Sequence, residues 1–208
     1  MPNTVLAIDS DYEDITVAAW EFRRANVYPY LESRGFNVVH LVASQASFDA
    51  VQDALKDPSV VLITGSGHGG DDFFSGYQDL PLFQTGSPYP GSVQNKVVHF
   101  LSCGSATLLG QDLVNNGCRA FFGYDENFSF DPASAQILFD CDGEIDRSLA
   151  DQCTAAQAAQ RVSSMFQQRI ADPSLDPRIV AYLQYDLAHF KNPTSLPNGR
   201  WGDPLAKL

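Results

Sequence analysis

Two stretches, VVLITGSGHGG at residues 60–70 and VVHFLSCGS at residues 97–105, decide the fold expected of this chain. Each begins with an apolar, β-branched run, which predicts buried strands at 59–65 and 96–102. Each ends in a glycine-containing turn with one reactive side chain, His68 in the first turn and Cys103 in the second. Ligands bind at the carboxyl ends of parallel strands, and consecutive strands can end side by side. The two stretches therefore predict a thiol and a histidine at the same edge of a sheet, as nucleophilic catalysis requires.

The rest of the chain extends this strand–helix alternation. Further strands are predicted at 4–9, 36–42 and 119–124, and helices at 15–33, at 47–56 with Ser47 as N-cap, at 105–116, at 154–171 and at 176–189. The alternation predicts an α/β fold with a mostly parallel central sheet and helices on both faces. Residues 75–95 are rich in Gly, Pro and Ser and predict turns or a small hairpin. Between 125 and 153 the pattern weakens, and we expect processing or disorder there.

Composition narrows the class of protein. A length of 208 residues suits one α/β domain spanning 1–208. The net charge of −12 disfavours nucleic-acid binding, which depends on Lys and Arg, and is compatible with a peptide or protein substrate. No apolar run is long enough to span a membrane, and no basic leader precedes an apolar stretch, so a cytoplasmic protein is expected. The alternative is an exported protein whose signal has been removed.

The four cysteines form no C-x-x-C pattern, so neither a zinc site nor a redox pair is indicated. Reduced thiols in the cytoplasm are the expected state, and two disulfides in an exported protein are the alternative. No cofactor is expected. The segment from Asp140 to Asp146 spaces carboxylates as a short Ca²⁺ loop does, but it lacks the full twelve-residue pattern, so a solvated acidic turn is favoured.

Cys103 gains chemical interest from its surroundings. A helix that begins near Ser105 would place positive partial charge beside the sulfur and lower the pKa of the thiol. The backbone N–H groups of Gly69 and Cys103 could stabilise an oxyanion. The plainer interpretation is a buried cysteine and an ordinary loop histidine. Other candidates are weaker: His40 and His99 are expected to be core histidines, His189 to end a helix, and Cys118 and Cys153 to be structural thiols.

These residues also resemble a known family. A strand followed by His-Gly, then a strand ending in Cys, is the signature of the caspase-like peptidase clan. TGSGHGGDDFF (64–74) resembles legumain and the GPI-transamidase group. The stretch GQDLVNNGCRAFFGY (110–124) is similar to gingipain-like and CHAT members, and WGDPLAKL (201–208) to the end of many gingipain-like domains. The resemblance implies a three-layer caspase-like (haemoglobinase-type) fold with about six strands.

The resemblance implies a cysteine endopeptidase that forms a thioester acyl-enzyme. His68 would be the catalytic histidine, Cys103 the nucleophile, and the N–H groups of Gly69 and Cys103 the oxyanion hole. No third member of the catalytic group is implied. The clan builds its specificity pocket from the end of strand one, the residues before the Cys, and the loop after strand five. The substrate-binding residues expected on this basis are Asp9, Asp11, Ser102, Asp125 and Glu126, whose carboxylates favour a basic P1 residue.

Three alternatives stay open. One is an amidotransferase-like hydrolase, which the order of His before Cys disfavours. Another is a catalytically silent caspase-like module that serves interaction or regulation. The third is a peptide ligase or transamidase, because it would use the same Cys-His pair and the same acyl-enzyme.

Overall fold

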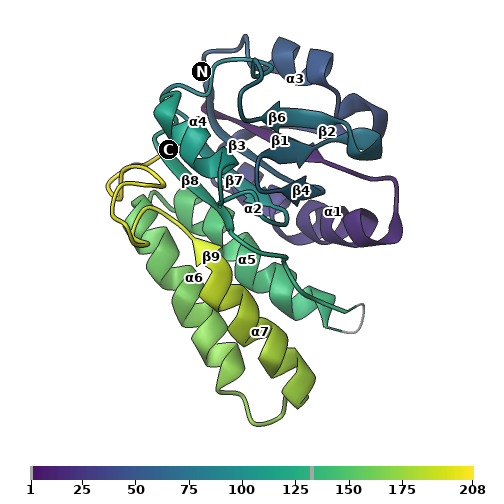
Figure 1. Ribbon diagram of the computed structural model, residues 1–208, viewed down its shortest axis with the longest axis vertical. Coiled ribbons are helices and arrows are strands. Elements are labelled where there is room, and N and C mark those ends of the chain that lie inside the picture. Colours follow the sequence, from purple (N-terminus) through teal and green to yellow (C-terminus); the bar gives the residue numbers. More distant parts are fainter. Residues whose placement is uncertain (1, 132–133) are drawn as a thin grey trace.

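A six-stranded sheet forms the centre of the molecule, as the computed structural model of residues 2–131 and 134–208 shows (Figure 1). Its strands lie in the order β2 (Asn37–Val42), β1 (Thr4–Asp9), β3 (Val60–Ser66), β7 (Val97–Leu101), β8 (Ala120–Tyr124) and β9 (Phe190–Lys191). The first five are parallel to one another, and β9 runs antiparallel to β8. The α/β fold with a mostly parallel sheet is therefore confirmed.

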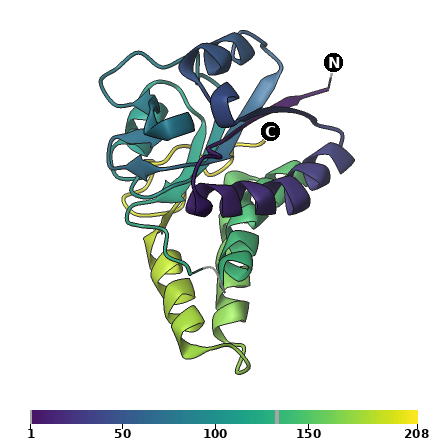
Figure 2. The same cartoon turned by 90° about the vertical axis from the view of Figure 1, so that its right-hand side faces the viewer.

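Helices cover both faces of this sheet. They are α1 (Asp14–Asn26), α2 (Tyr28–Ser33), α3 (Phe48–Ala54), α4 (Leu109–Asn115), α5 (Ala135–Ala150), α6 (Ala155–Ile170) and α7 (Pro177–His189). Side chains alternate across each strand, so Val5 and Ala7 of β1 pack into the core shared with α1 and α5. Leu6 and Ile8 pack into the core shared with α3 and α4. Two views at right angles show α6 and α7 extending beyond the sheet (Figures 1 and 2).

A small antiparallel sheet lies between β3 and β7 in the sequence. It consists of β4 (Gly69–Gly70), β5 (Phe73–Ser75) and β6 (Pro81–Gln84), with turns at Ala43–Gln45 and Tyr77–Asp79 beside it. Phe74 stacks on Phe100 of β7 with ring centroids 3.9 Å apart, and this contact anchors the small sheet to the central one. A hairpin is thus present, but β5 starts at Phe73, before the range 75–95 in which it was expected, and β4 adds a strand directly after His68.

Two predicted helices have different bounds. The helix expected over 15–33 is broken into α1 and α2 at Val27, because Pro29 lacks the N–H that a continuous helix would need. The helix expected over 105–116 begins only at Leu109. The N–H groups of Leu108 and Leu109 both bond to the carbonyl of Asp71, which fixes the start of α4 there.

The segment expected to be loose is largely helical. α5 occupies Ala135–Ala150, and Asp142 and Asp146 are buried on it, so the prediction of a Ca²⁺ loop or a solvated acidic turn was wrong. The prediction for His40 was also wrong, because β2 is an edge strand and this side chain is exposed. His99 is a fully buried core histidine, as expected. None of the described helices is long and apolar enough to cross a bilayer.

A buried ionic network explains the acidic residues of α5. His99 bonds through Nε2 to Asp142 at 3.2 Å and through Nδ1 to Asp146 at 3.1 Å. Arg23 of α1 donates to Asp146 at 3.0 Å and lies 3.4 Å from Asp9. Burial alone would lower the pKa of His99, but the two aspartates outweigh it and raise that pKa to about 9. The network links α1, β1, β7 and α5 on one face of the sheet.

The raised pKa of His99 makes stability depend on pH. A histidine with a pKa near 6.5 when unfolded and about 9 when folded stabilises the protein fully below pH 6.5, and this stabilisation is lost as the pH rises through 9. We expect the free energy of unfolding to fall by on the order of 3 kcal/mol over that range. Urea unfolding at pH 6.5, 8 and 9.5 would measure it. In His99→Gln the fall should be absent, and an equal fall in both proteins would refute the assignment to His99.

Candidate active site

A cavity of about 870 Å³ opens at the carboxyl ends of β3 and β7, and both His68 and Cys103 line it. His68 follows β3 by two residues and Cys103 follows β7 by two residues. β3 and β7 are neighbours in the sheet, with Ser66 opposite Leu101. The volume is within the usual range for ligand sites. The sheet thus brings the histidine and the cysteine to one cavity.

The turns that carry these two residues are packed closely together. Gly67 N–H bonds to the carbonyl of Leu101. A Cβ atom at Gly69 would lie 2.6 Å from the carbonyl oxygen of Cys103 and 2.9 Å from Oγ of Ser102. Gly104 has φ +66°, a conformation that favours glycine. Only glycine at 69 allows this approach, so the glycines beside the reactive residues are required by the contact between the two turns.

His68 is held by an acidic partner that the sequence analysis missed. Its Nε2 forms a hydrogen bond with Oε1 of Glu13, and Oδ1 of Asp79 lies 3.9 Å from the same nitrogen. The carbonyl of His68 accepts hydrogen bonds from N–H and Oγ of Ser75, which fix its backbone. Tyr12 contacts the imidazole edge-on at a centroid distance of 6.2 Å. This leaves Nδ1 as the ring nitrogen that can face a substrate.

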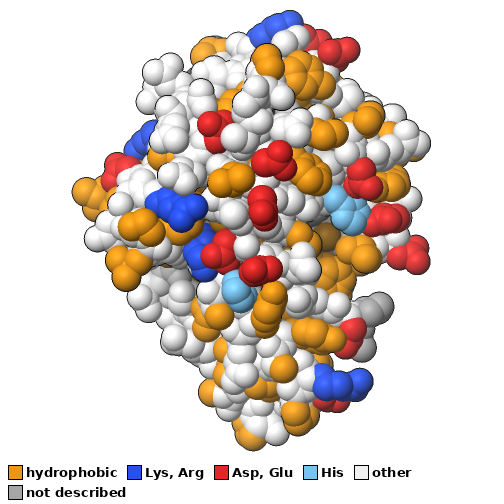
Figure 3. All heavy atoms as spheres, in the orientation of Figure 1, with side chains coloured by type: hydrophobic (Ala, Val, Ile, Leu, Met, Phe, Trp, Pro, Cys, Tyr) orange, Lys and Arg blue, Asp and Glu red, His pale blue; other side chains and the backbone are white. Residues whose placement is uncertain are grey.

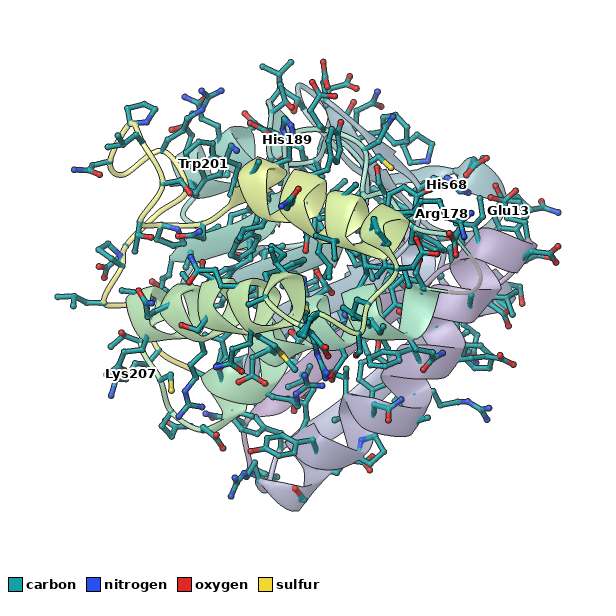
Figure 4. All side chains as sticks on the ribbon, turned by 90° about the horizontal axis from the view of Figure 1, so that it is seen from below. Glu13, His68, Arg178, His189, Trp201 and Lys207 are labelled. Carbon is teal, nitrogen blue, oxygen red and sulfur yellow. The ribbon has the colours of Figure 1, made fainter. Side chains whose placement is uncertain are left out.

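Figure 4 shows Glu13 and His68 next to each other where α1 begins. Glu13 is the N-cap residue of α1, so the loop after β1 and the turn after β3 meet at this point. The available sequence signal was the place of Glu13 in the acidic stretch after the first strand. On the face in Figure 3, two histidines each lie beside acidic side chains, so carboxylates accompany histidine more than once.

The surroundings of Cys103 do not lower the pKa of its thiol, contrary to the expectation from the sequence. α4 begins six residues after Cys103, and its first N–H groups bond to Asp71, so the N-terminus of α4 does not lie beside the sulfur as expected. Burial raises the pKa of Cys103, and the carboxylate of Asp186 raises it further. The N–H groups of Phe128 and of Cys103 itself act in the opposite direction on this pKa. The prediction of a lowered thiol pKa was therefore wrong, and the free thiol is the favoured form at neutral pH.

The expected substrate-binding residues are dispersed. Ser102 lines the cavity, is buried, and its Oγ has no hydrogen-bond partner among the described residues. Asp9 faces the interior, where its carboxylate accepts bonds from Tyr28 and Ser66. Asp125 pairs with His189 at 2.9 Å and with Lys191 at 3.1 Å. Asp11 and the exposed Glu126 lie outside the cavity lining. Within the described chain, none of the four carboxylates behind the expected basic P1 lines the cavity.

The remaining cysteines contribute nothing to this site. Cys118, Cys141 and Cys153 are buried and unpaired, and Cys103 is unpaired and partly exposed. Burial raises the pKa of both Cys118 and Cys141 to about 12, so their thiols are inert near neutral pH.

Over residues 2–131 and 134–208, no three His, Cys, Asp or Glu side chains converge as a metal would require.

Comparison of the structure with solved structures identifies its architecture. A chain from the complex of the pro- and mature domains of RgpB from Porphyromonas gingivalis superposes with a TM-score of 0.63 at 11% identity. The fold is caspase-like. The superposition covers 99% of the present chain and 48% of the RgpB chain, so this chain spans about half the length of its structural neighbour. No family model and no curated protein matched the sequence. At this identity the likeness establishes the fold, and function has to be argued from the cavity.

Proposed function

We propose that this protein is a cysteine peptidase in which Cys103 attacks the substrate carbonyl and His68 transfers the proton. The observation that supports this most directly is the cavity at the ends of β3 and β7, which both residues line. The caspase-like fold supports the same conclusion, because the peptidase clan that the stretches around His68 and Cys103 resemble has this fold. The place of the two residues in the sheet agrees with the general position of ligand sites in parallel α/β folds.

The reaction would proceed in two steps. Sγ of Cys103 passes its proton to Nδ1 of His68 as it attacks the peptide carbonyl carbon, and a tetrahedral oxyanion forms. His68, held at Nε2 by Glu13, delivers the proton through Nδ1 to the departing amine as the C–N bond breaks. Water then attacks the thioester, which releases the carboxylic acid and restores the thiol. The raised pKa of Cys103 means that its thiol is protonated in the resting protein, so His68 has to take this proton as the sulfur attacks.

The oxyanion donors proposed for these steps are the N–H groups of Gly69 and Cys103. The support is the tight contact between the two turns, in which the backbone at Gly69 lies against Ser102 and Cys103. Ser102 is the proposed substrate-binding residue with the best support, since it lines the cavity next to Cys103.

Active-site labelling tests the proposal. A mixture of peptidyl acyloxymethyl ketones with varied P1 residues should add one label to the wild-type protein, detected by intact mass. Cys103→Ala should add none, because the nucleophile is missing, and should lose peptide hydrolysis to background. Cys153→Ala is the matched control, since it removes a buried cysteine that lies outside the cavity. It should be labelled like the wild type.

Two outcomes would redirect the proposal. If wild type neither takes a label nor cleaves a mixed-P1 peptide library, with and without Ca²⁺, the peptidase assignment fails and the silent caspase-like module is favoured. If wild type is labelled and added amines capture the acyl group more readily than water does, the protein is a ligase or transamidase that uses the same thioester.

A further inference from the structure

The cavity beside Cys103 has apolar walls built from four separate parts of the chain. Its principal wall residues are Ile15, Ala18, Leu101, Phe128, Phe130 and Phe139. They come from α1, the end of β7, the loop after β8, and α5. Leu101 ends β7 two residues before Cys103, and both residues line the cavity, so the cavity begins at the nucleophile. Apolar walls of this kind stabilise a bound ligand when its apolar surface displaces water from them.

Charge is almost absent from this lining. Of the described residues around the cavity, Asp14 is the only one with a carboxylate, and none is Lys or Arg. Asp14 is exposed at the first turn of α1, so water already solvates its charge at the mouth. Transfer of a lysine or arginine cation past it into apolar walls would carry a desolvation cost, and no carboxylate of the described lining further inside offsets it. An anionic side chain would meet the same cost, with Asp14 repelling it at the entrance.

We infer that this cavity binds a large apolar side chain, aromatic or long aliphatic, on the substrate residue whose carbonyl Cys103 attacks. The inference rests on the proposed peptidase function and specifies its substrate class. A side chain of this kind contacts aromatic and aliphatic walls in place of water. The cavity of about 870 Å³ has room for the largest natural side chains. The substrate is thus a peptide with a bulky, uncharged residue at P1, in place of the basic residue expected from the sequence.

A series of peptidyl acyloxymethyl ketones that differ only at P1 tests this directly. These reagents have no residue on the leaving side of the scissile bond, so the side-chain preference they report belongs to P1. The Phe and Leu reagents should label Cys103 at least about tenfold faster than the Ala, Lys, Arg and Asp reagents, because burial of a large apolar side chain is worth about that factor or more. The same order should hold for kcat/KM on matched peptides.

Ala18→Asp supplies an engineered test. Ala18 is half-buried on α1 and lines the cavity, so the new carboxylate would give a cationic side chain the partner it lacks. The Phe-to-Lys preference should fall by about tenfold or more and move towards Lys. Ala181→Asp is the matched control, because Ala181 is exposed on α7 and does not line the cavity. It should keep the wild-type preference.

The possible outcomes separate this inference from the proposed function. Faster labelling by Lys, Arg or Asp reagents, or equal labelling by all of them, overturns the apolar P1 while leaving the peptidase intact. An absence of any labelling or cleavage overturns both. The wild-type series decides the matter even if Ala18→Asp does not fold, since it needs no variant.

Discussion

Replacement of Arg23 by Met should destabilise the protein by about 3–5 kcal/mol, the usual cost of removing one partner from a buried ionic cluster. Arg23 is 1% exposed and donates to Thr64, Tyr28 and Asp146. Arg23→Met keeps much of the side-chain volume but removes the cation beside Asp9 and leaves Asp146 with His99 alone. Denaturant unfolding followed by circular dichroism would measure the change in the free energy of unfolding.

Arg24→Met is the matched control for this prediction. Arg24 is the next residue on α1, is exposed, and makes only a stacking contact with Trp20, with 4.8 Å between the guanidinium carbon and the ring centroid. Its loss should cost less than about 1 kcal/mol. If the two substitutions cost the same, the buried network does not stabilise the fold as its geometry indicates.

The same network explains why Asp9 could be recognised as important yet assigned a wrong place. Strand-end carboxylates in a parallel sheet commonly face a ligand, and the sequence placed Asp9 at such an end. In the structure Asp9 binds Tyr28 and Ser66, so it ties the end of β1 to the end of β3 just before the turn of His68. Burial raises the pKa of Asp9, with Arg23 opposing. Asp9 therefore stabilises the strand ends that carry the site and does not itself line the cavity.

Much of the fold was predictable because its signals are local. Apolar β-branched runs gave β1, β3, β7 and β8 to within one residue at each end. Ser47 caps α3 by accepting from the N–H of Ala50, as its residue type suggested. The placement of His68 and Cys103 at one edge followed from strand order, which the alternation of strands and helices implies.

The parts that were missed depend on partners distant in sequence. In the sequence the acidic run in α5 resembles a surface turn, because its buried partners Arg23 and His99 are distant along the chain. His40 looked like a core residue because nothing local shows that β2 is the edge of the sheet. The late start of α4 follows from the carbonyl of Asp71, which a neighbouring turn supplies. In each case tertiary contacts override the local pattern.

Glu13→Ala should lower kcat for amide substrates by on the order of 100-fold with little change in KM, because the imidazole of His68 loses the group that orients it. The carboxylate of Glu13 bonds to Nε2 of His68. The carboxylate of Asp79 lies 3.9 Å from this nitrogen, too far to replace that hydrogen bond. Glu13→Gln keeps an oxygen that can accept the hydrogen bond and should recover part of the rate. Steady-state kinetics on a fluorogenic peptide amide would measure both variants.

The choice of leaving group separates a positioning role from a structural one. A peptide amide needs a proton on its departing nitrogen, whereas a p-nitrophenyl ester releases a stable anion and uses His68 only to take the proton of Cys103. Glu13→Ala should therefore slow ester hydrolysis much less than amide hydrolysis, and general damage to the cavity would slow both equally. Glu21→Ala, an exposed glutamate on the same helix, should leave both rates unchanged. Wild-type amide rates in both Glu13 variants would show that His68 works without this partner.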